Sequence, residues 1–284
     1  ERAPGHARSG PDAVKASLPE LPPWLAEYLV SDSAMARAYE GVTPAVHALC
    51  KHTLAVQHAF FDEAPDWEEQ RLARASCGLR TRACNRPADW ALVIFDAEYA
   101  SAPRLLAALM PALLARVPLV LSACIPGPPR PELLCALELA GQEQIYALDA
   151  PQSLDLVRGL AAQPGQGRLV LLHRGALSAL RAVADETGVP CWEERRAPVL
   201  RICGSEPDAA LIRLAHPDAA SADKATPDAV YCAEAEAAQA WAPLVFTPGM
   251  EGCWLHPSLA PDFFRVRSLT FGLAPAYPDA GDLP

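Results

Sequence analysis

Long apolar runs and secretion signals are missing from this sequence of 284 residues. No apolar run reaches the roughly twenty residues that a membrane span requires, and residues 1–11 lack the apolar centre of a signal peptide. None of the nine cysteines belongs to a C-x-x-C pair, and an odd number of scattered cysteines is typical of reduced thiols. We therefore expect a cytoplasmic protein with no membrane partner and no disulfide framework.

An excess of positive charge is also absent. The chain has 24 lysines and arginines against 34 aspartates and glutamates, which gives a formal net charge of −10. Binding to nucleic acid needs a concentrated basic face. The arginines that do gather are Arg71, Arg74, Arg80, Arg82 and Arg86, a pattern typical of a solvated helix face and loop. We expect no nucleic-acid partner.

Strand-length apolar runs alternate with helical stretches from residue 90 onward. Ala91–Phe95 and Pro118–Cys124 have the composition of buried strands, and Pro103–Arg116 between them is typical of a helix. Further helices are expected over Pro131–Ala140, Ser153–Ala161, Ala176–Thr187, Pro207–Ala215 and Ala233–Trp241, and further strands over Gln144–Leu148, Arg168–Leu172, Val199–Cys203, Val230–Cys232 and Leu244–Phe246. This alternation predicts an α/β fold with helices on both faces of mostly parallel sheets, which bind ligands at the carboxyl ends of their strands.

The region before residue 90 is predicted to be helical. Trp24–Val30 follows two prolines that can start a helix, and Thr43 is a capping hydroxyl ahead of a helix that runs to Phe61. Asp66–Cys77 is predicted as a further helix, because its acidic residues suit a helix amino terminus. These expectations divide the chain into a flexible arm (1–20), a helical preface (21–86), a first α/β unit (87–150), a second α/β unit (151–273) and an irregular tail (274–284).

An ordered set of short segments carries a family resemblance. The segments are Tyr99–Ala102, Leu109–Val117, Pro128–Pro131 and Leu139–Tyr146. In this order and at this spacing they resemble histidinol dehydrogenase, and Val56–Phe60 is similar to the segment that ends the helical opening of that family. The resemblance spans roughly residues 40 to 270. It implies Rossmann-like halves, an NAD cofactor, a zinc ion and a homodimer.

The resemblance also places a cofactor site. Its candidate cofactor-binding residues are Tyr99, Ser101, Gln152 and Gly175. Glycines let backbone amides approach a pyrophosphate, but Asp96 and Asp149 stand at two turns where the family has glycines. A carboxylate beside a pyrophosphate costs on the order of a kcal/mol through like-charge repulsion. We therefore expect a weak nucleotide or small-molecule site, with NAD as the cofactor that the resemblance implies.

The zinc site that the resemblance implies lacks most of its ligands. His216 matches a zinc-binding histidine of the family, but Arg213 stands at or near a glutamine ligand, and a guanidinium does not bind a cation. Residues 248–257 correspond to a region with an aspartate ligand and contain no aspartate. A catalytic zinc needs about three protein ligands. We therefore expect no metal site, and a solvent-facing position at a helix end for His216.

No catalytic residue can be assigned from the sequence. The acid–base Glu-His pair of the family has no counterpart around residues 230–236, although proton transfer at an alcohol needs a base within hydrogen-bond reach. Cys253 and His256 lie three residues apart in a loop, as a nucleophile and its base can, but without a third group. Cys124 follows a strand, and buried packing is the simpler explanation for it.

Three functions remain open. The first is a histidinol dehydrogenase-like protein that has lost zinc-dependent oxidation of histidinol and keeps a weak nucleotide or small-molecule site. The second is an active NAD-dependent oxidoreductase with a rearranged site, which the presence of Tyr99, Ser101 and His216 favours. The third is a non-catalytic interaction protein, with which the acidic charge and the proline-rich ends agree. A homodimer is compatible with all three.

Overall fold

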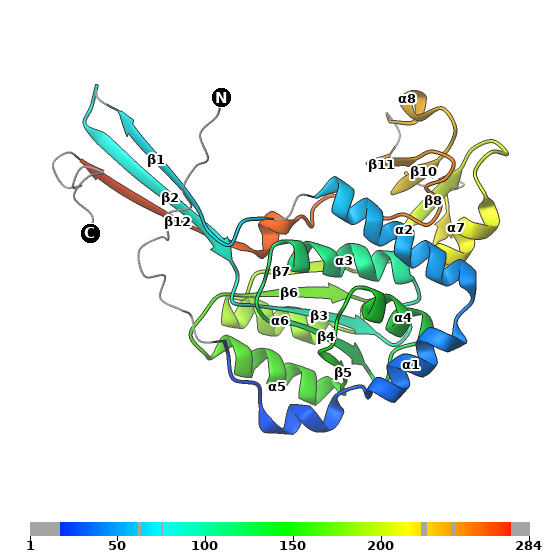
Figure 1. Ribbon diagram of the computed structural model, residues 1–284, viewed down its shortest axis with the longest axis horizontal. Helices are drawn as coiled ribbons and strands as arrows, with labels where there is room; N and C mark the ends of the chain where they lie inside the picture. Colours follow the sequence, from blue (N-terminus) through cyan, green and yellow to red (C-terminus); the bar gives the residue numbers. More distant parts are fainter. Residues whose placement is uncertain (1–17, 62–63, 75, 223–225, 240–241, 274–284) are drawn as a thin grey trace, which may run out of the picture.

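Five parallel strands form the central sheet of the protein in this computed structural model, which describes residues 18–61, 64–74, 76–222, 226–239 and 242–273 (Figure 1). The strands are β3 (Trp90–Asp96), β4 (Val120–Ile125), β5 (Ile145–Ala147), β6 (Gly167–Leu172) and β7 (Cys191–Glu194), in the order β5-β4-β3-β6-β7. The chain moves outward in one direction from β3 to β5 and in the other from β6 to β7. The point where the order reverses lies between β3 and β6.

Helices cover both faces of this sheet. The covering helices are α3 (Ala102–Leu114), α4 (Pro131–Leu139), α5 (Ala150–Ala161) and α6 (Ser178–Thr187). Val93 and Phe95 of β3 belong to the apolar core that contains α3 and α4, whereas Leu92 and Ile94 belong to the core that contains α5 and α6. Successive residues of a strand point to opposite faces, so a strand buried on both faces is apolar throughout. The predicted α/β fold class is confirmed.

The chain opens with helices that pack around the central sheet. They are η1 (Pro23–Tyr28), α1 (Asp32–Gly41) and α2 (Pro44–Phe60). The hydroxyl of Thr43 accepts a hydrogen bond from the N–H of Val46, so α2 begins where the capping pattern predicts. The sequence analysis did not predict α1, although Ser31 caps it in the same way by accepting from the N–H of Ala34. No helix of the described residues is long and apolar enough to cross a membrane.

A three-stranded antiparallel sheet, which we call the arm, projects from the body of the molecule (Figure 1). Its strands are β1 (Glu68–Arg74), β2 (Leu79–Pro87) and β12 (Arg265–Leu273), in the order β1-β2-β12. The predicted helix over Asp66–Cys77 is therefore wrong, and the segment 21–86 is helical only as far as Phe60. Pairing with β2 decides the conformation of this segment, and Gly78, with a φ of +67°, supports the turn between the two strands.

A second, smaller parallel sheet lies beyond the central one. Its strands are β8 (Val199–Ile202), β9 (Ala220–Ser221), β10 (Ala229–Tyr231) and β11 (Leu244–Phe246), in the order β11-β10-β8-β9, with α7 (Ala209–Ala215), α8 (Ala235–Ala238) and η2 (Pro261–Phe264) beside or after them.

The division of the chain at residue 150 needs correction, because β6 pairs with β3 and β7 pairs with β6 in the central sheet. The change of sheet falls between Glu194 and Val199. The proline- and glycine-rich turn after α5 leads directly into β6, which begins at Gly167. Some predictions concern residues outside those that the structure describes. These residues are 1–17 of the flexible segment predicted over 1–20, the predicted tail 274–284, and residues 240–241 of the helix predicted over Ala233–Trp241.

Gly167 in β6 lies so close to the Trp90 side chain that a larger residue would clash with it, which gives a test of the packing. A Cβ atom on Gly167 would lie 2.0 Å from the Trp90 ring, which is buried, so Gly167→Ala should lower the free energy of unfolding by about 1–3 kcal/mol. Gly159→Ala in α5 is the matched control, because nothing lies within 4 Å of its Cβ position and alanine favours a helix by up to about 1 kcal/mol. Urea unfolding measures both. Equal stability of Gly167→Ala and wild type would contradict the packing.

Candidate functional site

The carboxyl ends of β3 and β6 meet at the point where the strand order reverses, the usual place for a ligand in such sheets. Asp96 ends β3 and is buried there. Its carboxylate accepts hydrogen bonds from the N–H of Glu98 (3.1 Å) and from the N–H of Arg174 (3.0 Å), just after β6. A negative side chain of the protein itself therefore holds the backbone amides at this position.

Backbone N–H groups of the turn after β6 are also hydrogen-bonded to a side chain of the protein. Nδ1 of buried His173 accepts hydrogen bonds from the N–H groups of Gly175 (2.7 Å) and Leu177 (3.2 Å). Because Nδ1 accepts, Nε2 carries the hydrogen and donates it to Glu193 at 2.7 Å. With the N–H of Arg174 bound to Asp96, three amides of this turn have partners in the chain. This is the turn where the resemblance places the dinucleotide.

A cavity of about 210 Å³ lies beside this turn, between the start of α5 and the start of α6. Apolar side chains line most of it, namely Ile125, Pro126, Leu154, Leu177 and Leu180. Gln152 and Gly175 are next in sequence to residues that line it. Gln152 caps α5, where its side chain accepts from the N–H of Asp149 (2.8 Å) and its own N–H donates to the Asp149 carboxylate (2.8 Å). Gly175 has a φ of +104°, a conformation that favours glycine.

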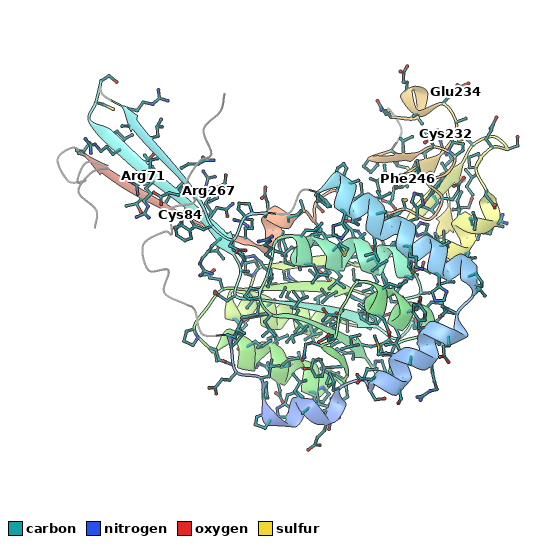
Figure 2. The ribbon with its side chains drawn as sticks, viewed as in Figure 1. Arg71, Cys84, Cys232, Glu234, Phe246 and Arg267 are labelled. Carbon is teal, nitrogen blue, oxygen red and sulfur yellow. The ribbon has the colours of Figure 1, made fainter. Side chains whose placement is uncertain are left out.

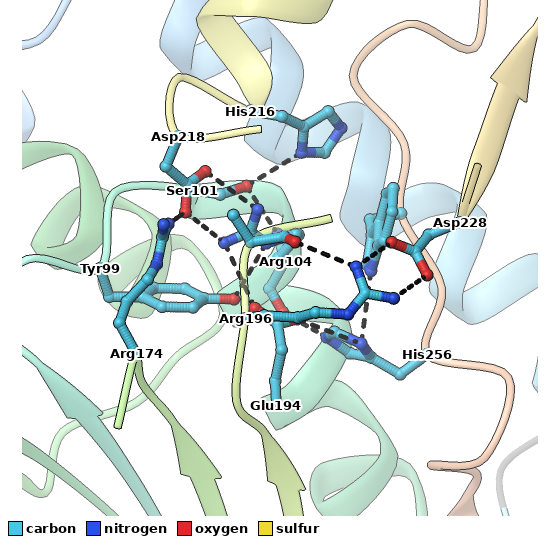
Figure 3. Close-up of polar contacts among 12 residues, drawn as sticks. Tyr99, Ser101, Arg104, Arg174, Glu194, Arg196, His216, Asp218, Asp228 and His256 are labelled. Atoms are coloured by element: carbon cyan, nitrogen blue, oxygen red, sulfur yellow. Dashed lines mark hydrogen bonds and ion pairs between the residues drawn. The ribbon is translucent and has the colours of Figure 1, made fainter. Parts of the chain in front are cut away.

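Tyr99 and Ser101, the other two candidate residues, lie in a different environment. Both are buried, and neither lines this cavity. They belong instead to a polar network around Arg104, whose side chain is fully buried although it is charged (Figure 3). The structure thus separates the four candidates into a pair beside the cavity and a pair inside the network.

The Arg104 guanidinium is held by groups from several elements. It donates to both oxygens of Asp218 (2.9 and 2.6 Å) and to the Tyr99 hydroxyl (3.3 Å), and it lies 3.3 Å from Glu194 (Figure 3). Arg174 forms a second ion pair with Asp218. Burial opposes the charge of Arg104, but its partners outweigh this effect and raise its pKa. Burial raises the pKa of Glu194 despite the opposing attraction of Arg104.

Ser101 connects this network to His216. Its hydroxyl donates to the carbonyl of Ala215 (2.7 Å) and accepts from the N–H of Arg104 (3.3 Å), so it also accepts from Nδ1 of His216 (3.1 Å). Nε2 of His216 accepts from the Tyr231 hydroxyl at 3.1 Å. Burial and the charge of Arg104 lower the pKa of His216 to about 3. The expected solvent-facing position of His216 is wrong, because its side chain is buried at the end of α7.

His256 is likewise neutral and fully engaged. Nε2 lies 3.1 Å from the carbonyl oxygen of Arg104 and donates to it, while Nδ1 accepts from the indole N–H of Trp254 (3.3 Å). Burial lowers its pKa to about 3. The separation of 3.6 Å between Nδ1 and Glu194 is therefore not an ion pair near neutral pH. Cys253 has another neighbour, His52, at 3.7 Å from its sulfur, and burial raises its thiol pKa to about 11.

These residues do not fit a zinc ion. Both nitrogens of His216 have hydrogen-bond partners, the Asp218 carboxylate is paired with two arginines, and Arg213 is exposed and cationic. A second cation near Arg104 would also be repelled. Across the described ranges, no group of three His, Cys, Asp or Glu side chains could hold a metal ion.

The network residues that the sequence analysis missed are Arg104, Glu194, Asp218, Arg174, His173 and Tyr231. One signal for Arg104 was present. It is the only charged residue of α3, whose other residues are apolar. A single charge in an apolar helix indicates a buried ion pair, because an unpaired charge is costly in a core. Its partners are distant in sequence and have no comparable signal.

Comparison with solved structures finds a similar fold. The crystal structure of histidinol dehydrogenase from Elizabethkingia anophelis matches 88% of this chain and 78% of its own, with a TM-score of 0.54 and 12% sequence identity. The chain shares the fold of that enzyme. At this identity the match concerns the fold alone.

Other matches are weaker. A putative aldehyde dehydrogenase, PutA, from Anabaena variabilis and lactaldehyde dehydrogenase from Escherichia coli each have a TM-score of 0.38, at 13% and 14% identity. They match 72% and 70% of this chain, but the chain spans only 44% and 45% of their lengths. No protein-family model matches the chain, and no curated protein matches it in sequence.

The two buried histidines predict a dependence of stability on pH. Their pKa of about 3 is below the ordinary value of 6.5, so the unfolded state binds more protons between these limits. The free energy of unfolding should therefore fall as the pH falls below 6.5, by up to about 1.4 kcal/mol per pH unit for each histidine. The raised pKa of Glu194 acts in the opposite sense, because it favours the folded state as the pH falls from that pKa toward 4.5.

Urea unfolding between pH 7 and pH 5 measures this slope. His256→Gln should reduce it, while the same replacement of the exposed His58 should leave it unchanged. A slope that is equal in wild type and His256→Gln would show that His256 is not held neutral by the fold.

Proposed function

We propose that this histidinol dehydrogenase-like protein does not carry out zinc-dependent oxidation of histidinol, and that it binds a small molecule weakly in the cavity between α5 and α6. The observation that carries the proposal is the use of the amides after β6. Asp96 and His173 take three of them, while the neighbouring cavity is lined mainly by apolar side chains. A ligand in this cavity would therefore be bound through an apolar ring of its own and not through a phosphate group.

The cavity chemistry supports a flat, mostly uncharged group such as a purine base. Ligand sites are largely apolar with a few polar groups that orient the ligand, and a volume of about 210 Å³ is that of a fragment and not of a whole dinucleotide. The pyrophosphate of NAD would meet the Asp96 carboxylate in place of free N–H groups. NAD should therefore bind through its adenine ring alone, with a dissociation constant in the millimolar range.

The hydrogen bonding of the network argues against the oxidoreductase alternative. A base for alcohol oxidation must reach the substrate hydroxyl, but His216 and His256 are buried and have partners at both ring nitrogens. An active oxidoreductase would have to turn over a substrate. Saturable NAD binding at micromolar levels by the zinc-supplemented protein, with oxidation of an amino alcohol, would replace our proposal with an active enzyme.

Filling the cavity should abolish binding. Ala179 lines the cavity and is exposed, so Ala179→Phe should occupy it at little cost to folding. We expect adenosine, followed by ligand-observed NMR or calorimetry, to bind the wild type and to bind this variant at least about tenfold more weakly. Ser178→Phe, at the preceding exposed position outside the lining, is the matched control. Equal adenosine binding by wild type and Ala179→Phe would exclude the cavity as the site.

Removing the charge of Asp96 should improve the binding of phosphate-bearing ligands. Asp96→Asn removes the like-charge repulsion, which is worth on the order of a kcal/mol, and keeps one acceptor oxygen for either the N–H of Arg174 or the N–H of Glu98. We expect NAD to bind this variant up to about tenfold more tightly in calorimetry. Adenosine, which has no phosphate, should bind both proteins equally. An unchanged NAD affinity would show that Asp96 does not oppose the pyrophosphate.

A further inference from the structure

Two cysteines follow the ends of neighbouring strands in the smaller sheet. Cys203 comes directly after β8, and Cys232 comes directly after β10. The two strands are parallel neighbours, and their last aligned residues are Ile202 and Tyr231. The N–H of Cys203 donates to the carbonyl of Tyr231 at 2.8 Å, so the pairing continues up to the cysteines. Because each cysteine is the next residue of its strand, the two lie opposite each other.

Both cysteine side chains lie on the same face of the smaller sheet. Successive residues of a strand alternate between faces, and Tyr231 belongs to the core on the opposite face. Cys232 forms an apolar cluster with Val230 and Ala238, and Cys203 packs against this cluster. Neighbouring strands are about 4.8 Å apart, and the Cα atoms of a disulfide are usually about 4.4–6.8 Å apart. The register therefore places the two sulfur atoms within reach of one bond.

The surroundings of Cys232 agree with this proximity. Burial raises the pKa of its thiol, and the neighbouring Cys203 raises it further, because two thiolates repel each other. The Cys232 sulfur also donates to the carbonyl of Glu234 at 3.5 Å. Figure 2 shows Cys232 and Glu234 together at the end of the smaller sheet. Both cysteines are free thiols in this structure, so it describes the reduced form of the pair.

The pair occupies the position at which parallel sheets bind their ligands. The smaller sheet has the order β11-β10-β8-β9, so the chain moves outward from β8 to β9 in one direction and from β10 to β11 in the other. The strand order therefore reverses between β8 and β10. Cys203 and Cys232 stand at the carboxyl ends of the two strands on either side of this point. Neither lines the cavity between α5 and α6, so the chemistry of the pair is independent of the proposed small-molecule site.

The two thiols differ in exposure, and this difference orders their roles. Cys203 is partly exposed, whereas Cys232 is 5% exposed. A thiol must be accessible to react with a reagent in solution. Cys203 is therefore the thiol that reacts first, and Cys232 is placed to react with it. A second neighbouring pair, Cys50 of α2 and Cys135 of α4, is 0% exposed and has no such access.

We propose that Cys203 and Cys232 form a redox-active dithiol that exchanges with the disulfides of small thiol compounds, such as glutathione disulfide. In the first step the Cys203 thiolate attacks one sulfur of the small disulfide, whose S–S bond breaks and releases one thiolate. In the second step the Cys232 thiolate attacks the Cys203 sulfur, which forms the Cys203–Cys232 bond and releases the second thiolate. The two cysteines are oxidised, and the small disulfide is reduced to two thiols, which take up the two protons that the cysteines lose.

The bond between the two cysteines should be readily reversed. Side chains that leave neighbouring strands side by side are separated by about 4.8 Å, which exceeds the Cβ separation of about 3.8 Å that disulfides favour. Forming the bond must therefore draw the ends of β8 and β10 together. Strained or exposed disulfides are the labile ones. Such a bond forms and breaks as the ratio of disulfide to thiol in the surroundings changes.

Peptide mass spectrometry of the full chain tests the pair. The protein is incubated with glutathione disulfide, its remaining thiols are alkylated after unfolding, and its peptides are identified. We expect a peptide pair joined through Cys203 and Cys232, while Cys50 and Cys135 are found alkylated. Dithiothreitol should restore both thiols of the pair. A chain in which Cys203 and Cys232 stay reduced, or carry glutathione without joining to each other, overturns the proposal.

Single serine variants test the order of the two steps. Cys232→Ser should stop at a stable glutathione adduct on Cys203, because no second thiol displaces the glutathione. Cys203→Ser should react at Cys232 at least about tenfold more slowly, because the remaining thiol is buried. Cys84→Ser is the matched control and should form the bond as the wild type does, because Cys84 is a partly exposed strand cysteine whose aligned neighbours are Glu69 and Ser268. An internal disulfide that still forms in Cys232→Ser, or equal rates in the two variants of the pair, overturns this assignment.

Discussion

The buried Arg104 guanidinium is the contact on which the relation between the two parallel sheets depends. Arg104 comes from α3 on the central sheet, Glu194 from the end of β7, and Asp218 from the segment after α7 beside the smaller sheet. A buried cation must be neutralised to be tolerated. Because its partners lie on both sides of the change of sheet, Arg104 links the two sheets, beside the apolar core in which Ala107 of α3 packs with residues of the smaller sheet.

This arrangement also limits the chemistry that the protein can perform. Both nitrogens of His216, the residue that the resemblance matches to a zinc ligand, are occupied by hydrogen bonds, and the nearby Asp218 carboxylate is paired with two arginines. At the carboxyl ends of the strands, the Asp96 carboxylate occupies amides that would otherwise face an anion. Side chains of the protein thus satisfy the groups that a metal and a pyrophosphate would use, and what remains beside them is an apolar cavity.

The local sequence pattern correctly predicted strands that are buried along their whole length and a helix start that depends only on neighbouring residues. β3, β4 and β6 are buried on both faces and read as apolar runs, and Thr43 marks the start of α2 through a bond to a residue three positions away. The pattern failed at Asp66–Cys77, because the charged residues of β1 suit a solvated helix as well as an exposed strand. The partner that decides between them is β2, which in turn pairs with β12 from the far end of the described chain.

The sequence by itself determined the α/β class, the order of most strands and helices, and the absence of a concentrated positive charge, since these follow from composition and short-range periodicity. It also indicated Asp96 and Asp149 as carboxylates at turns where the resembling family has glycines. Only the tertiary structure decided that Tyr99 and Ser101 lie inside a polar network, that His216 is buried, and that β1, β2 and β12 form one antiparallel arm. The reason is that burial and strand pairing are properties of contacts between distant segments, and the free energy of such contacts exceeds any local preference of the residues involved.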